Sequence, residues 1–247
     1  MKKVFSLMLL LATIFTFTSC GGDDDEPDNT KLSKTSYSLY HEENQEIEGT
    51  NVSGLVWDSE NEFVATVKNG VITGQFVGKT MVKSSTNLSF TAEVKPRYHT
   101  YEEPSLDWGA SKATIKAKYG TPYSENATGL IYKTTNSNAP IMIFVFENNK
   151  MSNCGVVCKI STASQLADFL LERYLPVKVD TNNYSATLLH CYGKINDPQV
   201  DFGVAMQYSS SIGGILVAYT PTTASKSRSS NDVDFGEAFN ALEQILR

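Results

Sequence analysis

The chain has two regions with different patterns of apolar and polar residues. Between residues 31 and 96, short runs alternate apolar with polar side chains and are separated by turn residues. Runs rich in β-branched and aromatic residues predict strands, and Asn69-Gly70 between two of them predicts a tight hairpin. The runs cover residues 37–40, 55–57, 64–67, 71–73 and 90–94. Several short strands at this spacing predict a small β-sandwich.

In the region after residue 96, helical patterns alternate with strand-like runs. A short helix is expected over about 110–119, and a second from Thr162, which forms a capping box with Gln165, until Pro176 stops it. Strand-like runs follow each helix, at 129–134, 140–147 and 151–160 and then at 184–192, 200–209 and 214–220. One helix and three strands, found twice, predict an α+β domain over 98–247. We expect a duplicated α-β-β-β unit with an antiparallel sheet and with helices on one face.

A third helix is predicted at the end of the chain. Asp234 and Glu237 form a cap-like pair, and apolar residues recur beside it at helical spacing. The apolar stripe consists of Phe235, Ala238, Phe239, Leu242, Ile245 and Leu246. Such a stripe is typical of a helix that docks on a core, and a partner-binding helix is the alternative.

The first residues have the pattern of an export signal. Two lysines precede an apolar stretch over residues 4–17, which is shorter than the roughly 20 residues that a membrane-spanning helix needs. Its length fits the apolar part of a signal peptide over residues 1–19. The stretch ends in Phe17-Thr18-Ser19-Cys20, which resembles the lipobox of bacterial lipoproteins. The resemblance implies cleavage before Cys20 and attachment of lipid to it, and an ordinary signal peptide with an incidental cysteine is the alternative.

An acidic stretch follows the cysteine, within a predicted tether over residues 20–30. Its sequence at positions 21–26, Gly-Gly-Asp-Asp-Asp-Glu, resembles the tether that directs Bacteroidetes lipoproteins to the outer leaflet. The resemblance implies a protein of the outer membrane or cell surface, held by its lipid anchor. As a polymer, such a segment is an extended and flexible linker, and a linker that serves solubility alone is the alternative.

Net charge limits the classes of partner. The formal charge of the whole chain is −6, and removal of residues 1–19 takes away two lysines and changes it to −8. An acidic chain without a basic cluster argues against nucleic acid and against anionic lipid as partners.

The stretch over residues 57–85 carries a recognisable pattern of small, aromatic and branched residues. It resembles the bacterial Ig-like domain, group 2, at Trp57, Ser59, Val64, Ala65, Val67, Gly70, Val71, Gly74, Gly78 and Val82. The resemblance implies an Ig-like domain over 31–96 that acts as a spacer or adhesive unit and carries no catalytic residues. It also places Trp57 in the core, whereas a sugar-stacking role for Trp57 would need an exposed ring.

A second pattern begins at Asp107-Trp108-Gly109 and continues through Tyr119-Gly120-Thr121-Pro122 to the run over 144–151. It resembles small helix-then-sheet periplasmic modules, among them β-lactamase-inhibitor-like and outer-membrane-assembly accessory lipoproteins. The resemblance is one of pattern, and it implies an inhibitor or assembly factor only as an alternative function.

The cysteines and histidines do not form a recognisable catalytic or metal motif. Cys154 and Cys158 lie roughly 13 Å apart in one predicted strand, too far for a disulfide with each other. Either could pair with Cys191 across strands, and buried free thiols are the alternative. His190 adjoins Cys191, but neighbouring side chains in a strand point to opposite faces. No spacing predicts a metal site or a phosphate-binding glycine loop, so we expect no metal and no cofactor.

One strand suggests a binding surface. The predicted strand over 141–146 is apolar on both faces, whereas a sheet with helices on one side should have a polar second face. An uncovered aromatic face would be a ligand or partner site, and cover by the third helix or by the Ig-like domain is the alternative. The candidate ligand-binding residues are Tyr132, Phe144, Phe146, Tyr208 and Tyr219.

These features together favour a non-enzymatic cell-envelope lipoprotein. In this hypothesis the Ig-like domain spaces a C-terminal interaction domain from the membrane, and the partner is a glycan, a peptide or another envelope protein. The alternative function is an envelope hydrolase that uses Cys191 or carboxylates such as Asp201 in the C-terminal domain.

Overall fold

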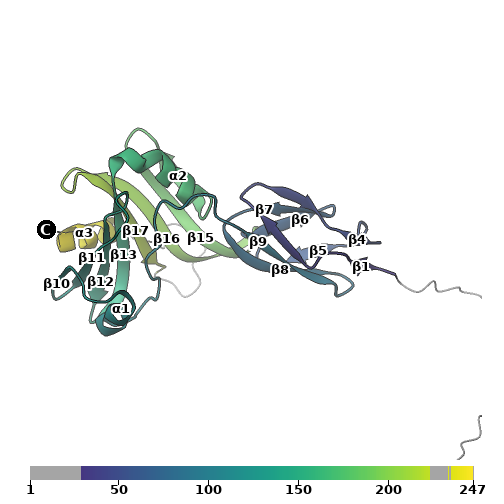
Figure 1. Cartoon of the computed structure of the whole chain (residues 1–247), viewed down its shortest axis with the longest axis horizontal. Helices are drawn as coiled ribbons and strands as arrows, with labels where there is room; N and C mark the ends of the chain where they lie inside the picture. The colour runs from purple at the N-terminus through teal and green to yellow at the C-terminus, as the bar shows by residue number, and fades with distance from the viewer. Residues whose placement is uncertain (1–28, 223–232, 234, 247) are drawn as a thin grey trace, which may run out of the picture.

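The computed structural model describes residues 29–222, 233 and 235–246. Within this part of the chain, strands predominate over helices and form several separate sheets (Figure 1). The expected signal peptide, the lipidation site Cys20, most of the acidic tether and the capping residue Asp234 lie outside the described residues. None of the helices that are described is long and apolar enough to cross a membrane.

The N-terminal unit consists of short strands in three sheets. The strands are β1 (Lys31–Leu32), β2 (Ser36–Leu39), β3 (Asn44–Glu46), β4 (Gly49–Thr50), β5 (Trp57–Ser59), β6 (Ala65–Lys68), β7 (Val71–Gly74), β8 (Gly78–Ser84) and β9 (Ser89–Val94). Their orders are β2-β9-β8-β5, β3-β7-β6 and β1-β4. Strands β2 and β9 run parallel, and the other neighbours run antiparallel.

The two larger sheets of this unit enclose one apolar core. Ala65 and Ile72 come from the three-stranded sheet, and an aromatic group comes from the four-stranded sheet. In that group the ring of Phe90 lies 4.8 Å from the ring of Tyr37 and 5.3 Å from that of Trp57. Trp57 is only 8% exposed, so the prediction that it is a core residue is confirmed.

Two tight hairpin turns follow directly from asparagine and glycine residues. Asn69 and Gly70 join β6 to β7 with φ values of 52° and 75°. Asn148 and Asn149 join β12 to β13 with φ values of 51° and 60°. Positive φ at both central residues is the requirement of the turn that best fits the twist of a hairpin. The Asn69-Gly70 turn was predicted from the sequence and is confirmed.

The C-terminal unit is built around one eight-stranded antiparallel sheet. Its elements are α1 (Lys112–Tyr119), β10 (Ser124–Glu125), β11 (Gly129–Lys133), β12 (Ile141–Glu147), β13 (Lys150–Cys158), α2 (Ala163–Leu171), β14 (Leu175–Asp180), β15 (Ser185–Lys194), β16 (Asp197–Ser209), β17 (Gly214–Pro221) and α3 (Phe235–Leu246). The strand order is β10-β11-β12-β13-β17-β16-β15-β14. Helix α1 and helix α2 are each followed by four strands, whereas three were expected from the sequence.

The additional strand β14 differs from the sequence-based prediction around α2. The helix ends at Leu171, and Pro176 lies within the following edge strand instead of stopping the helix. Proline fits there because an edge strand leaves one row of backbone groups unpaired. The predicted capping box is also wrong, since the hydroxyl of Thr162 donates to the Lys159 carbonyl at 2.7 Å and caps no helical N–H.

Helices cover both faces of the sheet, which corrects the expectation of helices on one face. Ile115 of α1 and Leu166 of α2 pack on one face, whereas Leu242 and Ile245 of α3 pack on the other. Gly155 in β13 permits the close approach of α3, because a Cβ there would lie 2.9 Å from a methyl group of Leu242. The central strand β12 is therefore apolar on both sides because both sides are buried.

The two units meet end to end through the β15–β16 hairpin (Figure 1). The Glu62 amide donates to the Gly193 carbonyl at 2.8 Å, and the Ile195 amide donates to the Glu62 carboxylate at 2.9 Å. The Lys194 ammonium donates to the Ser59 carbonyl at 2.6 Å and forms an ion pair with Asp58. An apolar cluster of Phe63, Phe76, Leu175, Leu189, Cys191 and Val200 lies beside these polar contacts.

A buried carboxylate reinforces this contact at the end of α2. Glu172 is 2% exposed and accepts hydrogen bonds from the amides of Arg97 at 2.9 Å and Tyr98 at 3.1 Å. Its side chain also pairs with Arg173, and its carbonyl accepts from the Val77 amide at 2.9 Å. Glu172 thus connects α2, the inter-unit segment and the N-terminal unit.

Candidate functional site

Most of the aromatic residues proposed from the sequence lie in the core. Tyr132, Phe144, Phe146 and Tyr219 are at most 6% exposed, and Tyr208 alone among the five candidates is substantially exposed, at 39%. The expectation of a continuous exposed aromatic face is therefore corrected. The cause is tertiary: α1 and α2 cover one face of the sheet and α3 covers the other.

Tyr219 belongs instead to a buried cluster of phenol groups around Glu103. The hydroxyl groups of Tyr101 and Tyr219 lie 2.5 Å apart, and the Tyr219 hydroxyl donates to the Glu103 carboxylate at 3.3 Å. The Tyr174 hydroxyl donates to the same carboxylate. Burial raises the pKa of Tyr101, Tyr174 and Tyr219 well above the ordinary value. The three phenols therefore stay protonated at neutral pH and act as hydrogen-bond donors.

Arg173 completes the surroundings of Glu103. Its guanidinium lies 3.7 Å from the Glu103 carboxylate, donates to the Tyr98 carbonyl at 3.1 Å, and stacks over the Phe169 ring at 3.7 Å. The carboxylate of Glu103 thus already has two phenols and a cation as partners. This arrangement holds the segment before α1 against the sheet, and it leaves Glu103 engaged rather than free to act as a base.

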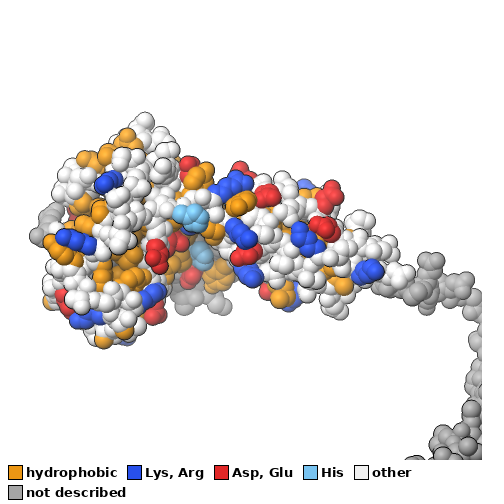
Figure 2. Space-filling view, in the orientation of Figure 1, with side chains coloured by type: hydrophobic (Ala, Val, Ile, Leu, Met, Phe, Trp, Pro, Cys, Tyr) orange, Lys and Arg blue, Asp and Glu red, His pale blue; other side chains and the backbone are white. Residues whose placement is uncertain are grey.

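A second polar pair, His190 and Asp201, lies on neighbouring strands near the junction of the two units. The His190 Nδ1 atom is 3.5 Å from an Asp201 carboxylate oxygen, and its ring stacks on Phe202 at 4.6 Å. Burial lowers the pKa of His190, although the charges of Asp201 and Glu103 oppose the shift. Figure 2 shows histidine side chains beside acidic ones where the broad unit meets the narrower one. At neutral pH, the imidazole is therefore uncharged.

The three described cysteines are free and buried. Burial raises the pKa of Cys158 to about 12 and that of Cys191 to about 11, and it raises the pKa of Cys154 well above the ordinary value. The alternative of buried thiols, rather than a disulfide with Cys191, is the one found. Cys191 packs with the inter-unit cluster whereas the neighbouring His190 stacks on Phe202, so the two do not form a nucleophile–base pair.

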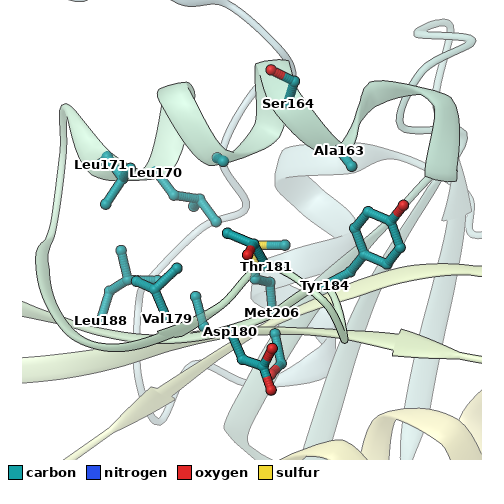
Figure 3. A pocket seen from close by; sticks show the side chains of 13 residues that line it. Ala163, Ser164, Leu170, Leu171, Val179, Asp180, Thr181, Tyr184, Leu188 and Met206 are labelled. Atoms are coloured by element: carbon teal, nitrogen blue, oxygen red, sulfur yellow. The ribbon is translucent and has the colours of Figure 1, made fainter.

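An apolar pocket of about 310 Å³ lies between α2 and the edge of the sheet formed by β14, β15 and β16. In Figure 3, Leu170 and Leu171 of the helix lie opposite Val179 and Leu188, and Tyr184 stands at the other end of the pocket. The remaining lining residues are Ala163, Ser164, Ala167, Asp180, Thr181, Ser185, Ala186 and Met206. Three of the lining residues are alanines, which leave space where larger side chains would fill it.

Among the described residues that line the pocket, Asp180 carries the one charged side chain, and hydrogen bonds stabilise its charge. Its carboxylate accepts from the side chain of Asn183 at 2.8 Å and from the amides of Asn182 and Asn183 at 3.1 and 3.3 Å. These bonds lower the pKa of Asp180, the Asn183 side chain contributing most. No Lys, Arg, His or Cys is among the described residues that line the pocket. The walls of the pocket are therefore mainly apolar and can bind apolar groups.

Sequence reasoning did not identify this pocket. Helical periodicity marks the large apolar residues of α2, such as Leu166 and Phe169, which are fully buried. Ala163 and Ala167 lie one turn apart on the same helix and were not singled out. Their spacing is the one available signal, since small residues at positions i and i+4 create a shallow strip on a helix.

Comparisons with known proteins add little to this geometry. No protein-family model and no curated protein matches the chain. A solved structure of an extracellular protein containing a SCP domain from Bacillus anthracis has 14% sequence identity and a TM-score of 0.24, over 52% of this chain and 50% of that protein. Similarity at this level supports neither a common fold nor a common function. Among the residues described, no group of His, Cys, Asp and Glu is arranged to hold a metal ion.

Proposed function

We propose that this chain is a lipid-anchored protein of the cell envelope, exposed at the surface of the outer membrane. An Ig-like domain over 31–96 serves as its spacer, and the domain over 98–247 is a non-catalytic binding domain. The observation that carries the proposal is the pocket beneath α2, whose walls are apolar and whose volume of about 310 Å³ falls at the lower end of the range of ligand sites.

The architecture supports the division into spacer and binding domain. Two facing sheets around Trp57 and Phe90 fit an Ig-like sandwich. In the C-terminal unit, a helix and four strands occur twice, and the halves meet where β13 pairs with β17. This order fits a duplicated unit, enlarged by one strand per copy compared with the α-β-β-β unit expected from the sequence.

The contact between the two units supports a rigid spacer. Apolar packing of Phe63 and Phe76 against β15 and β16 is combined with the hydrogen bonds of Glu62, Lys194 and Glu172. Interfaces with both apolar and buried polar contacts restrict hinge motion between domains. A spacer joined in this way would hold the pocket at a fixed distance from the folded end of the tether.

The chemistry of the ionisable groups favours binding over the alternative of an envelope hydrolase. The Cys191 thiol is buried with a pKa of about 11, and a thiol acts as a nucleophile only when ionised. Glu103 is engaged by Tyr174, Tyr219 and Arg173. The other alternative, an inhibitor or assembly accessory lipoprotein, is also a binding function and differs only in the partner.

The anchor is tested by Cys20→Ser. Loss of the lipidated sulfur should leave the protein unprocessed or move it to the soluble fraction, while the parent fractionates with membranes. Cys191→Ala is the matched control, since it removes a cysteine without touching the anchor, and it should remain with the membranes. Protease treatment of intact cells should degrade the parent if it is surface exposed. Equal membrane partitioning of the Cys20→Ser variant and the parent would refute the lipoprotein.

A further inference from the structure

One row of side chains beneath α1 and α2 crosses the sheet from β11 to β14, which is every strand except the edge strand β10. Directly paired residues on antiparallel strands project to the same face. From β11 to β14, the successive partners are Tyr132, Met142, Val156, Val217, Met206, Ala186 and Val179. The pairs in this row therefore allow the space under one helix to be compared with the space under the other.

Two equivalent positions of the row are filled differently. Tyr132 and Ala186 each lie two strands outward from the central pair of Val156 and Val217. The ring of Tyr132 packs at 5.5 Å from the ring of Tyr119 at the end of α1. In the other half of the sheet, Ala186 contributes only a methyl group. The pocket beneath α2 thus lies where the corresponding position beneath α1 holds an aromatic ring.

The alanines of α2 enlarge this space. Ala163 and Ala167 line the pocket from the helix, and Ala186 and Met206 line it from the sheet. Protein interiors are close-packed, and unfilled apolar space lowers the free energy of unfolding by the contacts that its lining loses. A ligand that restores these contacts would recover part of that loss.

The charges around the pocket limit the chemistry of the ligand. Asp180 is its only charged lining residue, and the lowered pKa of Asp180 keeps it ionised. No cation is present among the described residues of the walls, so an anionic head group would meet repulsion from Asp180 without a compensating positive charge. The hydroxyl groups of Ser164, Thr181 and Tyr184 can donate hydrogen bonds to a polar substituent or accept them from it.

The edge strand beside the pocket argues against an added peptide strand. Pro176 has no N–H to donate, and Lys178 places a charge on β14. The pairing of β14 with β15 also shifts register between Pro176 and Lys178. Proline, lysine and bulges are the devices that prevent edge strands from pairing with another chain. The occupant is therefore better explained as a small molecule.

We propose that the pocket between α2 and β14–β16 binds a small, uncharged and largely apolar molecule. The inference rests on the proposed function, since it names the ligand class of the binding domain. The ligand inserts between the helix and Ala186, in the volume that Tyr132 occupies in the other half of the sheet. Any polar substituent that it carries is neutral and lies toward Tyr184 or Thr181.

Two fluorescent probes with the same ring system test this inference. N-phenyl-1-naphthylamine is neutral, and 1-anilinonaphthalene-8-sulfonate adds one negative charge. The mature chain from residue 20, produced without lipid, should enhance the fluorescence of the neutral probe and bind the anionic probe at least about tenfold more weakly. Equal affinity for both probes would overturn the assignment of a neutral ligand.

Substitutions that fill the pocket locate the binding. Ala186→Tyr, which copies the ring found beneath α1, should weaken binding of the neutral probe at least about tenfold. Ala167→Leu fills the same space from the helix, so the test does not depend on one variant. Circular dichroism would detect misfolding of either variant. Val56→Tyr adds a tyrosine at a position that is 74% exposed in the other unit and should bind the probe as the parent does.

The outcomes separate this inference from the proposed function. Full affinity in folded Ala186→Tyr and Ala167→Leu would place the probe elsewhere and overturn the pocket assignment. Displacement of the probe by extended apolar peptides but not by neutral small molecules would replace the ligand class with a peptide. No binding of the neutral probe to the parent would reject the ligand class and leave the lipid anchor standing, because membrane anchoring through Cys20 is measured independently.

Discussion

Burial determines the chemistry of the three thiols in the C-terminal unit. Since Cys191 has a pKa of about 11 and Cys158 one of about 12, about one Cys191 thiol in a thousand is ionised at pH 8. We expect Ellman's reagent to leave Cys154, Cys158 and Cys191 unmodified in the folded protein and to modify all three in guanidinium chloride. The Cys20→Ser protein is the appropriate sample, because it contains only these three cysteines.

The same measurement addresses the hydrolase alternative. Rapid modification of one thiol in the folded protein, lost in Cys191→Ala, would show that Cys191 is accessible and ionised. That result would contradict the burial of Cys191 and restore it as a candidate nucleophile. Slow modification that follows the rate of unfolding agrees with buried thiols.

The residues of the pocket could not be predicted from the sequence, because a cavity is an absence of side-chain volume between distant segments. Ala186 lines it only because its partner in the sheet is Met206 and because Ala167 lies above it. Local patterns mark large apolar residues, and they do not tell which small residues face one another. Similarly, the sequence showed that the strand over 141–146 is apolar on both faces, but whether α3 covers the second face depends on how the chain folds in three dimensions.

At the scale of elements, the end of α2 depends on one buried carboxylate. Glu172 accepts two backbone amides from the inter-unit segment and pairs with Arg173. Glu172→Gln should lower the free energy of unfolding by about 3 kcal/mol, because it leaves the Arg173 charge without its buried partner and brings an amide N–H toward other donors. Chemical denaturation of both proteins, followed by circular dichroism, measures the difference.

A matched substitution controls for the chemical change itself. Glu125→Gln removes the same charge from an exposed pair with Lys116, whose atoms are 3.0 Å apart. Its effect should stay within about 0.5 kcal/mol, as for other exposed ion pairs. Equal losses in the free energy of unfolding for the two variants would show that the contacts of Glu172 do not stabilise the connection between α2 and the inter-unit segment.

The elements that could be predicted are those set by local chemistry. Asn69-Gly70 and Asn148-Asn149 specify their hairpins within four residues, α1 follows from its stop signal at Gly120, and α2 and α3 follow from periodicity. Strand β14 was not predicted because a proline is compatible with two structures, the end of a helix and an edge strand. Only the pairing of β14 with β15 distinguishes the two, and that pairing is tertiary.

At the scale of the whole molecule, the contact between the two units predicts that they unfold together. Phe63 of the N-terminal unit is 6% exposed and packs with Leu189, Cys191 and Val200 of the C-terminal unit. Apolar surface shared in this way couples the stability of one unit to that of the other, because separation exposes it to water. Each unit contains one tryptophan, Trp57 or Trp108, so each can be followed by its own fluorescence.

We therefore expect the fluorescence transitions of Trp57→Phe and Trp108→Phe proteins, each with one remaining tryptophan, to coincide in guanidinium chloride. Addition of Phe63→Ala removes the central apolar contact and should lower the free energy of unfolding of the coupled molecule by about 3–5 kcal/mol. It should also separate the two transitions. Phe239→Ala, on α3 and away from the N-terminal unit, should shift the transitions without separating them. Transitions that are already separate in the proteins with Phe63 intact would show that the units are independent and that the spacer is flexible.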